Sequence, residues 1–333
     1  MITSKHGKNH CFTWFFKRAP VIIVLFIVGL CPYSANAFDI LLGTEEAGTF
    51  SHFTGRILCR AINSYAGDIN CKTVPAPDDV DNLTNLRAGS LDIGLIDSRM
   101  LSDAVNKTGN FEFLDISYEN LRVLVPLYYT PIALVVRSDA RINSLDDLKG
   151  KRINAGAPLS IEHLAMDTIM KTKNWSTNDF GLVQELPASQ SQDTMAFCHG
   201  TVQAMLNIGV HPDSSLQQLF KLCKARLVNM DDKDIEKLVN DHPVFSKIDI
   251  AADTYPSHTQ GITTFGTMGM LVASEDLDEQ TVYKIMDAIY SNPKRLKSAH
   301  PALSLFTVDS ARKIDAGAQP HAGSTKYFLE HGM

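Results

Sequence analysis

The sequence lacks several features that would point to an enzyme or a metal protein. It contains neither the Gly-x-Ser-x-Gly nor the His-Glu-x-x-His pattern of common hydrolases, and its histidines are scattered along the chain. No two cysteines are spaced as Cys-x-x-Cys, so a zinc site is not indicated. We therefore expect no catalytic activity, no metal and no other cofactor.

A nucleotide-binding loop is also missing, although one stretch has its glycine spacing. In LLGTEEAGTF, residues 41–50, Gly43 and Gly48 stand five apart, as in a phosphate loop. The Lys of that loop is absent, and the carboxylates of Glu45 and Glu46 would repel a phosphate group. The stretch retains only a backbone pattern, which is a strand, a glycine-bounded turn and the start of a helix over 53–62.

Long apolar runs are limited to the N-terminus, where Ala19 to Leu30 follow four basic residues and precede Ala35-Asn36-Ala37. This order is typical of a secretory signal, and it predicts cleavage after Ala37 and a periplasmic mature protein. A membrane anchor is the alternative reading, but about 20 apolar residues are needed to span a bilayer. A lipoprotein anchored at Cys31 is a minor option, since the preceding Leu30 is bulky.

The mature chain has no excess of positive charge. Cleavage removes four of the 31 basic residues and none of the 37 acidic ones, which leaves a formal charge of -10. Nucleic acid is therefore not an expected partner. Four cysteines remain in an oxidising compartment, and their spacing favours the disulfides Cys59–Cys71 and Cys198–Cys223. Four buried thiols are the alternative.

The mature chain alternates strand-like and helix-like runs and shows no repeat. This alternation predicts an α/β fold with largely parallel sheets, and nearly 300 residues favour two lobes. The expected strands cover 39–42, 92–96, 121–127, 132–136, 152–155 and 267–272, and the expected helices include 161–170, 216–223 and 279–290.

Two loops that follow strands and open helices, 43–52 and 156–163, are the expected ligand-binding positions, because ligands of open α/β sheets bind at the carboxyl ends of strands. Asp97 also follows a strand, where it either faces a ligand or is an ordinary turn residue beside Arg99. Tyr128 and Tyr129 either pack in a hinge or line a cleft.

Five motifs in order resemble the TAXI-type solute receptors of tripartite ATP-independent periplasmic (TRAP) transporters. GTEEAGTFSHFTG is similar to the glycine-rich opening of that family, and DDVDNLTNLRAGSLDIGLIDS is similar to its S-V-E-N-L segment. SLDDLKGKRINAGAPLSIEHLA resembles its S-L-x-D-L-K-G-K segment. ADTYPSHTQGITTFGTMGMLVAS and the ending PHAGSTKYFLEHG complete a resemblance that spans residues 39 to 332.

The resemblance implies a type II periplasmic-binding-protein fold with lobes at 38–131 plus 269–333 and at 132–268. It implies closure of the lobes on a small organic acid or amino acid, which is delivered to a TRAP permease. An extracytoplasmic sensor of the same fold, signalling to a membrane receptor, is the alternative. The implied ligand-binding residues, by position, are Thr44, Glu45, Thr49, His52, Asp97, Ser160, Asn207 and Tyr255.

This sequence departs from the family at the binding positions. Glu45 and Glu46 replace glycines, Asp97 replaces Gln, and Leu159 and Ile161 interrupt a Gly-Ser-Gly loop. Added acids disfavour a dianion, which leads to the hypothesis of a ligand with a cationic or amino group. The alternative is that the glutamates point into solvent and that Ser160 with helix amides holds a carboxylate.

Overall fold

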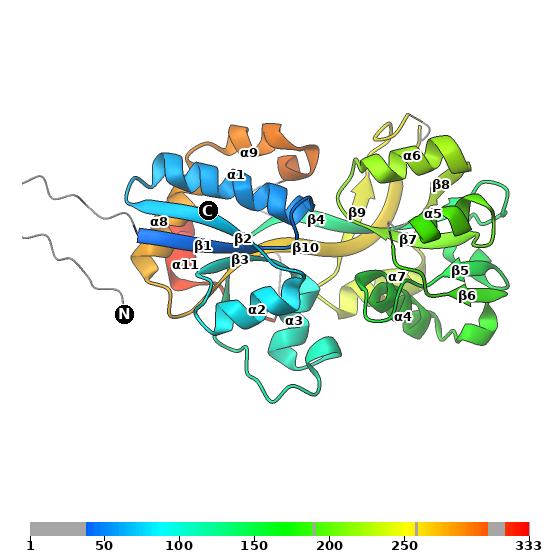
Figure 1. Cartoon of the computed structure of the whole chain (residues 1–333), viewed down its shortest axis with the longest axis horizontal. Helices are drawn as coiled ribbons and strands as arrows, with labels where there is room; N and C mark the ends of the chain where they lie inside the picture. The colour runs from blue at the N-terminus through cyan, green and yellow to red at the C-terminus, as the bar shows by residue number, and fades with distance from the viewer. Residues whose placement is uncertain (1–37, 189–190, 257–258, 306–316, 333) are drawn as a thin grey trace, which may run out of the picture. The chain divides into compact units, whose positions relative to one another are not determined.

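The computed structural model describes residues 38–332 except 189–190, 257–258 and 306–316. The expected signal segment, with its cleavage site, lies outside the described residues. Among those described, ten strands form one sheet (Figure 1). They are β1 Phe38–Thr44, β2 Ile69–Pro75, β3 Ile93–Asp97, β4 Leu121–Arg137, β5 Arg152–Asn154, β6 Leu182–Gln184, β7 Ala204–Ile208, β8 Ala225–Val228, β9 Ser246–Ile250 and β10 Ile262–Ser274.

The sheet has the order β2-β1-β3-β10-β4-β7-β5-β6, with β8 beside β4 and β9 beside β10. Strands β1, β2 and β3 are parallel to each other, and so are β5, β6 and β7. The expectation of largely parallel sheets is wrong at the centre, where β4 and β10 are antiparallel to each other and to their other neighbours. Hydrophobic periodicity predicts a strand but not the direction of its partner.

Strands β4 and β10 are long and run through both ends of the molecule in Figure 1. The two strands expected at 121–127 and 132–136 are one strand that continues through Pro131. Pro131 has no N–H to donate, but its carbonyl accepts a hydrogen bond from the amide of Gly209 at 3.2 Å. Both β4 and β10 therefore run without a break from the β1–β3 side of the sheet to the β5–β7 side.

Helices lie on both faces of the sheet, and the expected amphipathic runs fall inside them. The α-helices are α1 Phe50–Tyr65, α2 Asp79–Arg87, α3 Ser98–Asn106, α4 Ile161–Lys173, α5 Ser191–Cys198, α6 Ser214–Cys223, α7 Lys233–Asp241, α8 Glu279–Tyr290, α9 Pro293–Ala299 and α11 Ala322–Glu330. Short 3-10 helices cover η1 Gly109–Phe111, η2 Leu145–Leu148, η3 Thr177–Asp179 and η4 Pro301–Leu305.

Buried apolar side chains gather in four clusters. Two surround β1 and β3 with α1, α2, α3 and α8, which we call lobe 1. Two surround β5, β7, β8 and β9 with α4, α6 and α7, which we call lobe 2. We propose the bounds 38–131 with 269–333 and 132–268, which keep the buried members of each cluster on one side except Met268.

Each lobe contains one of the two disulfides favoured by the sequence. Cys59 on α1 is bonded to Cys71 on β2 in lobe 1. Cys198 at the end of α5 is bonded to Cys223 at the end of α6 in lobe 2. Each bond joins a helix to a neighbouring element of the same lobe.

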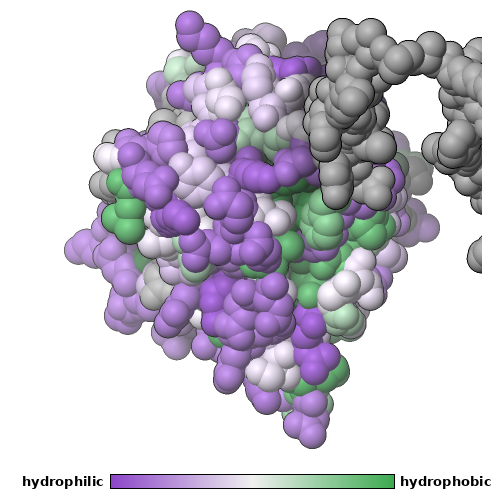
Figure 2. Space-filling model, turned by 90° about the vertical axis from the view of Figure 1, so that its left-hand side faces the viewer, coloured by the Kyte–Doolittle hydropathy of each residue, from purple (hydrophilic) through white to green (hydrophobic). Residues whose placement is uncertain are grey.

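The molecular surface at the β1–β2 end is mostly hydrophilic, and hydrophobic residues gather in one area of it (Figure 2). In the described part of the chain, every helix is too short or too polar to cross a membrane.

Candidate functional site

A cavity of about 500 Å³ lies where β4 and β10 pass from one lobe to the other. Lobe 1 contributes the loop after β1, the start of α1, the start of α2 and the junction of β3 with α3. Lobe 2 contributes the start of α4 and the segment after β7, with the apolar side chains of Leu159, Ile161, Leu164, Ile208, Val210 and Phe245. The volume falls in the range that is usual for small-molecule sites.

Four carboxylates line the lobe 1 wall. Glu45 follows β1, Asp78 and Asp79 begin α2 after β2, and Asp97 ends β3. Because β2, β1 and β3 are parallel neighbours, their carboxyl ends meet at one edge of the sheet and bring these residues together.

The carboxylates differ in their hydrogen bonds. Asp79 Oδ2 accepts from the amide of Asp97 at 2.8 Å, and Asp97 accepts from the amide of Arg99 at 2.9 Å and from the hydroxyl of Thr267. The side chain of Glu45 makes no hydrogen bond with the described residues. Asp97 is thus used as the N-cap of α3, while Glu45 is available to a ligand.

The cavity disfavours the ionised forms of three of these acids. Burial raises the pKa of Glu45, and the charges of Asp97 and Asp78 raise it further. Burial likewise raises the pKa of Asp79 well above its usual range, with Glu45 as the next cause. Burial also raises the pKa of Asp97, against the opposing hydrogen bonds from Thr267 and backbone amides. These raised pKa values indicate that nearby positive charges of the protein do not offset the cost of burying the three carboxylates.

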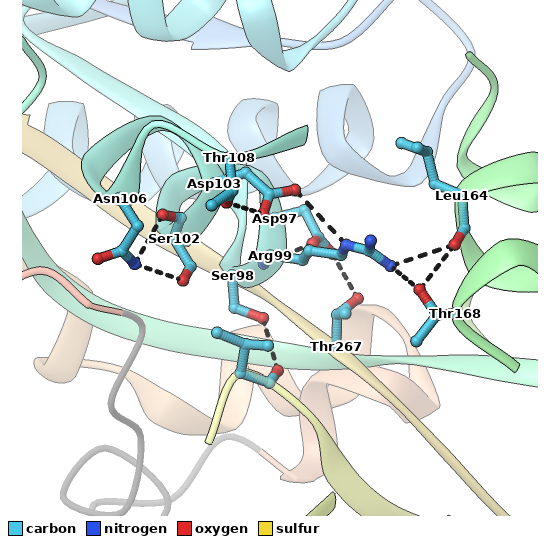
Figure 3. A network of polar contacts seen from close by, with 11 residues as sticks. Asp97, Ser98, Arg99, Ser102, Asp103, Asn106, Thr108, Leu164, Thr168 and Thr267 are labelled. Atoms are coloured by element: carbon cyan, nitrogen blue, oxygen red, sulfur yellow. Dashed lines mark hydrogen bonds and ion pairs between the residues drawn. The ribbon is translucent and has the colours of Figure 1, made fainter. Parts of the chain in front are cut away.

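Arg99 lines the same cavity, but its guanidinium is directed across to lobe 2 (Figure 3). Nη1 donates to the hydroxyl of Thr168 at 2.9 Å and to the carbonyl of Leu164 at 3.4 Å, both on α4. Nε lies 3.5 Å from a carboxylate oxygen of Asp103 on α3. The charge of Arg99 is therefore shared with Asp103 and α4.

Tyr128 both lines the cavity and packs in the core, so the two roles considered from the sequence, packing and lining a cleft, apply together. Its side chain is 7% exposed, and its ring meets the ring of Phe50 edge-on at 4.8 Å between centroids. Its hydroxyl is hydrogen-bonded to Ser51. Burial raises the pKa of Tyr128, and Glu45 is the next cause, so the phenol stays protonated.

Three of the eight residues expected to bind a ligand line the cavity, namely Glu45, Thr49 and Asp97. Thr44 and His52 lie behind this wall, where the Thr44 hydroxyl and His52 Nδ1 are 2.9 Å apart and Thr44 is fully buried. The side chain of a residue at the end of a strand, such as Thr44, can point into the protein as readily as toward the cleft.

The three remaining candidates of lobe 2 also lie outside the lining. Ser160 caps α4 by accepting from the amide of His163, so its oxygen is used within the helix. Asn207 lies within β7, just before the residues that reach the cavity. Tyr255 is buried, and its hydroxyl accepts from the amide of Asp213 at 2.8 Å, so it supports the loop that carries Asp213.

Asp78, Asp79 and the apolar wall of lobe 2 were not predicted from the sequence. A signal for the acids was present, because they follow Pro75-Ala76-Pro77 and begin a helix, as the residues after β1 and β3 do. The apolar wall has no comparable signal, since residues such as Ile208 have the same pattern as core residues.

Residues 42–332 match the NMT1-like family model. The chain belongs to the NMT1-like family. The fold of this NMT1-like protein is similar to that of a TctC solute binding protein from Polaromonas, with a TM-score of 0.54 and 15% identity over 90% of this chain and 96% of that one. It is also similar to a protein from Bordetella bronchiseptica, with a TM-score of 0.51 and 12% identity over 90% and 99% of the two chains. These likenesses show the two-lobed α/β fold that binding proteins share.

Proposed function

We propose that this NMT1-like protein is a periplasmic solute-binding protein. It captures a small organic acid or amino acid between its lobes and delivers it to a membrane permease. The observation that carries the proposal is the cavity at the crossing of β4 and β10, which both lobes line. The layout of residues 1–37 as a secretory signal supports export, and the fold shared with a TctC solute binding protein supports solute capture.

The proposed mechanism is closure of the lobes without covalent chemistry. A solute that contacts both walls binds the closed state more tightly than the open state and shifts the population by that difference. Direct hydrogen bonds between the lobes at the start of α3 also stabilise the closed state. The Ser98 hydroxyl donates to the carbonyl of Val244 at 3.1 Å, and Arg99 reaches α4 as described above. Among the described residues, the proposed lobe bounds are crossed by β4 and β10, so these two strands would bend.

A carboxylate of the solute has a place at the start of α1. The amides of Phe50 and Ser51 belong to the first turn of this helix, both residues line the cavity, and neither amide has a hydrogen-bond partner among the described residues. The positive end of a 16-residue helix favours an anion there.

Binding is tested first, by a thermal-shift screen of residues 38–333 against amino acids, amines and carboxylates. A solute that binds only the folded state raises the unfolding midpoint. We expect at least one small solute to do so, with binding lost when Tyr128→Ala removes the floor of the cavity. A protein that binds none of the compounds would contradict the proposal.

The proposed partner is the permease of a TRAP transporter, on the resemblance of the five sequence motifs to TAXI-type receptors. The test is uptake of the bound solute into vesicles that contain a TRAP permease from the same organism. We expect uptake to need the binding protein and an ion gradient but no ATP. Uptake that needs ATP would assign the protein to another class of transporter, and solute binding without uptake would favour a sensor.

A further inference from the structure

The cavity has an unbalanced charge. Five acidic residues line it, namely Glu45, Asp78, Asp79, Asp97 and Asp213, and Arg99 is the single Lys or Arg among the described lining residues. Asp78 and Asp213 are engaged as N-caps of α2 and α6, and Asp78 is exposed. Glu45, Asp79 and Asp97, which we call the acidic trio, remain on the wall of lobe 1 without an ion pair to any Lys or Arg of the described residues.

Asp79 gives an independent indication that a ligand completes this wall. Its side chain lines the cavity although the residue is only 7% exposed. One carboxylate oxygen accepts from the amide of Asp97, and the other has no partner among the described residues. A buried carboxylate without a cation or a full set of donors is costly, so a donor from the cavity would stabilise it.

Arg99 does not fill that role in this conformation. Its guanidinium donates to Thr168 and Leu164 of α4 and lies beside Asp103, away from Glu45 and Asp79. Its effect on Asp97 is weaker than that of the Thr267 hydroxyl. Arg99 thus contacts lobe 2 and acts on Asp97, but among the described residues it makes no ion pair with Glu45 or Asp79.

We infer that the solute carries a cationic group, such as a protonated amine, which binds at the acidic trio beside Tyr128. This inference rests on the proposed function as a solute receptor and places the solute among amines and amino acids, in place of organic acids that lack an amino group. An ammonium group supplies the donors that Glu45 and Asp79 lack, and a phenol face beside it adds attraction. The remainder of the solute faces the apolar wall of lobe 2.

The structure separates the two readings of the glutamate pair. Glu46 is exposed and lies outside the lining, whereas Glu45 lines the cavity. Ser160, which would hold a carboxylate in the alternative reading, is used as the cap of α4. A dicarboxylate would therefore bring two negative charges to a cavity whose lobe 1 wall already carries the trio, and its carboxylates would be left to the starts of α1 and α4.

The test uses two matched pairs of solutes in isothermal titration of residues 38–333. Putrescine and succinate share a four-carbon chain and differ in charge, and L-glutamate and 2-oxoglutarate differ at the carbon that bears the amino group. We expect the amine of at least one pair to bind, and its affinity to exceed that of its partner by at least about tenfold, as for the loss of a buried charged contact.

Matched variants locate the cation. Glu45→Gln and Asp79→Asn should each weaken binding of that amine by about tenfold or more, and Glu46→Gln should leave it unchanged because Glu46 is exposed. Unfolding midpoints without solute check that each variant is folded. Asp79→Asn keeps the acceptor for the Asp97 amide, so it preserves the local structure.

Each result bears on the inference in a defined way. Binding of 2-oxoglutarate or succinate in preference to the matched amine would overturn the cationic solute and leave the receptor function standing. Amine binding that is equally insensitive to Glu45→Gln, Asp79→Asn and Asp97→Asn would also overturn it, since the cation would lie elsewhere. If none of the four solutes binds at millimolar concentration, the inference fails, and the wider screen then decides the receptor function separately.

Discussion

The guanidinium of Arg99 on α3 donates a hydrogen bond to the hydroxyl of Thr168 on α4 at 2.9 Å, and this bond joins lobe 1 to lobe 2 (Figure 3). The contact is next to the proposed solute site, because the preceding residues Asp97 and Ser98 begin the same helix. Asp97 faces the cavity, and Ser98 bonds to lobe 2 through Val244. A short stretch of chain therefore contacts the cavity and the opposite lobe together.

Removing this contact should shift the protein toward the open state. Thr168→Val deletes the nearer of the two acceptors of Arg99 on α4 and leaves the carbonyl of Leu164. A hydrogen bond to a charged group is worth about 1.5–3 kcal/mol. We expect a larger radius of gyration in small-angle X-ray scattering without solute, and weaker solute binding. Thr172→Val is the matched control, since Thr172 lies one turn further along α4 and bonds only to the carbonyl of Thr168. Equal scattering from the two variants would contradict a role of Arg99 in closure.

The acidic trio should make stability depend on pH. Burial raises the pKa of Asp79 in the folded state, so above the ordinary carboxyl pKa of 3.8 the folded protein holds a proton that the unfolded chain has lost. The contribution of this group to stability therefore decreases as the pH rises from that value through the raised pKa. The facing groups Glu45, Asp78 and Asp97 increase the effect, and Arg99 opposes it at Asp97.

Urea unfolding of the wild type and of Asp79→Asn at several pH values isolates this contribution. We expect the difference in unfolding free energy to favour Asp79→Asn increasingly as the pH rises. A difference that stays constant from acidic to neutral pH would show that folding does not raise the pKa of Asp79.

Gly269 on β10 should be required for the shape of the cavity. A Cβ at this position would lie 2.2 to 2.6 Å from atoms of the Tyr128 ring, so Gly269→Ala forces the ring to move. We expect a loss of about 1–3 kcal/mol of stability, as for other overpacked sites, together with weaker solute binding. Gly209 also lines the cavity but has open space at its Cβ, so Gly209→Ala should keep the wild-type thermal midpoint. Equal midpoints for the two variants would contradict the close packing of Tyr128.

The disulfide between Cys59 and Cys71 should stabilise lobe 1. It closes a loop with a sequence separation of 12, and disulfides of this kind contribute about 2–4 kcal/mol. We expect the double variant Cys59→Ala with Cys71→Ala to unfold at lower urea concentration than the wild type. Alkylation of the unreduced, unfolded wild type measures free thiols, and modification of these two cysteines would contradict the bond.

The sequence predicts individual elements well where a periodic pattern decides them. The run from Glu279 to Tyr290 is expected as a helix and is α8 with the same bounds, because its apolar residues repeat at helical spacing. The pairing of β4 with β10 could not be predicted in this way. Their contacts join residues more than 130 positions apart, and no local pattern records them.

The candidate site is predicted in part for a similar reason. Glu45 and Asp97 follow strands, and strand ends meet at one edge of a parallel sheet, so position alone brings them to the cavity. Ser160 also follows a strand, but its hydroxyl is taken by the backbone of α4. Position in the fold predicts which loops form the cleft, whereas competition for hydrogen bonds decides which side chains face it.

A small solute is proposed to bind between the two lobes. Hydrogen–deuterium exchange, measured with and without the tightest-binding solute of the screen, tests it most directly. We expect protection in both walls of the cavity, at residues 45–51 and 95–100 of lobe 1 and at 159–165 and 208–213 of lobe 2. Protection confined to one lobe, or centred on the smaller cavity of about 200 Å³ between α7 and β10, would contradict the claim.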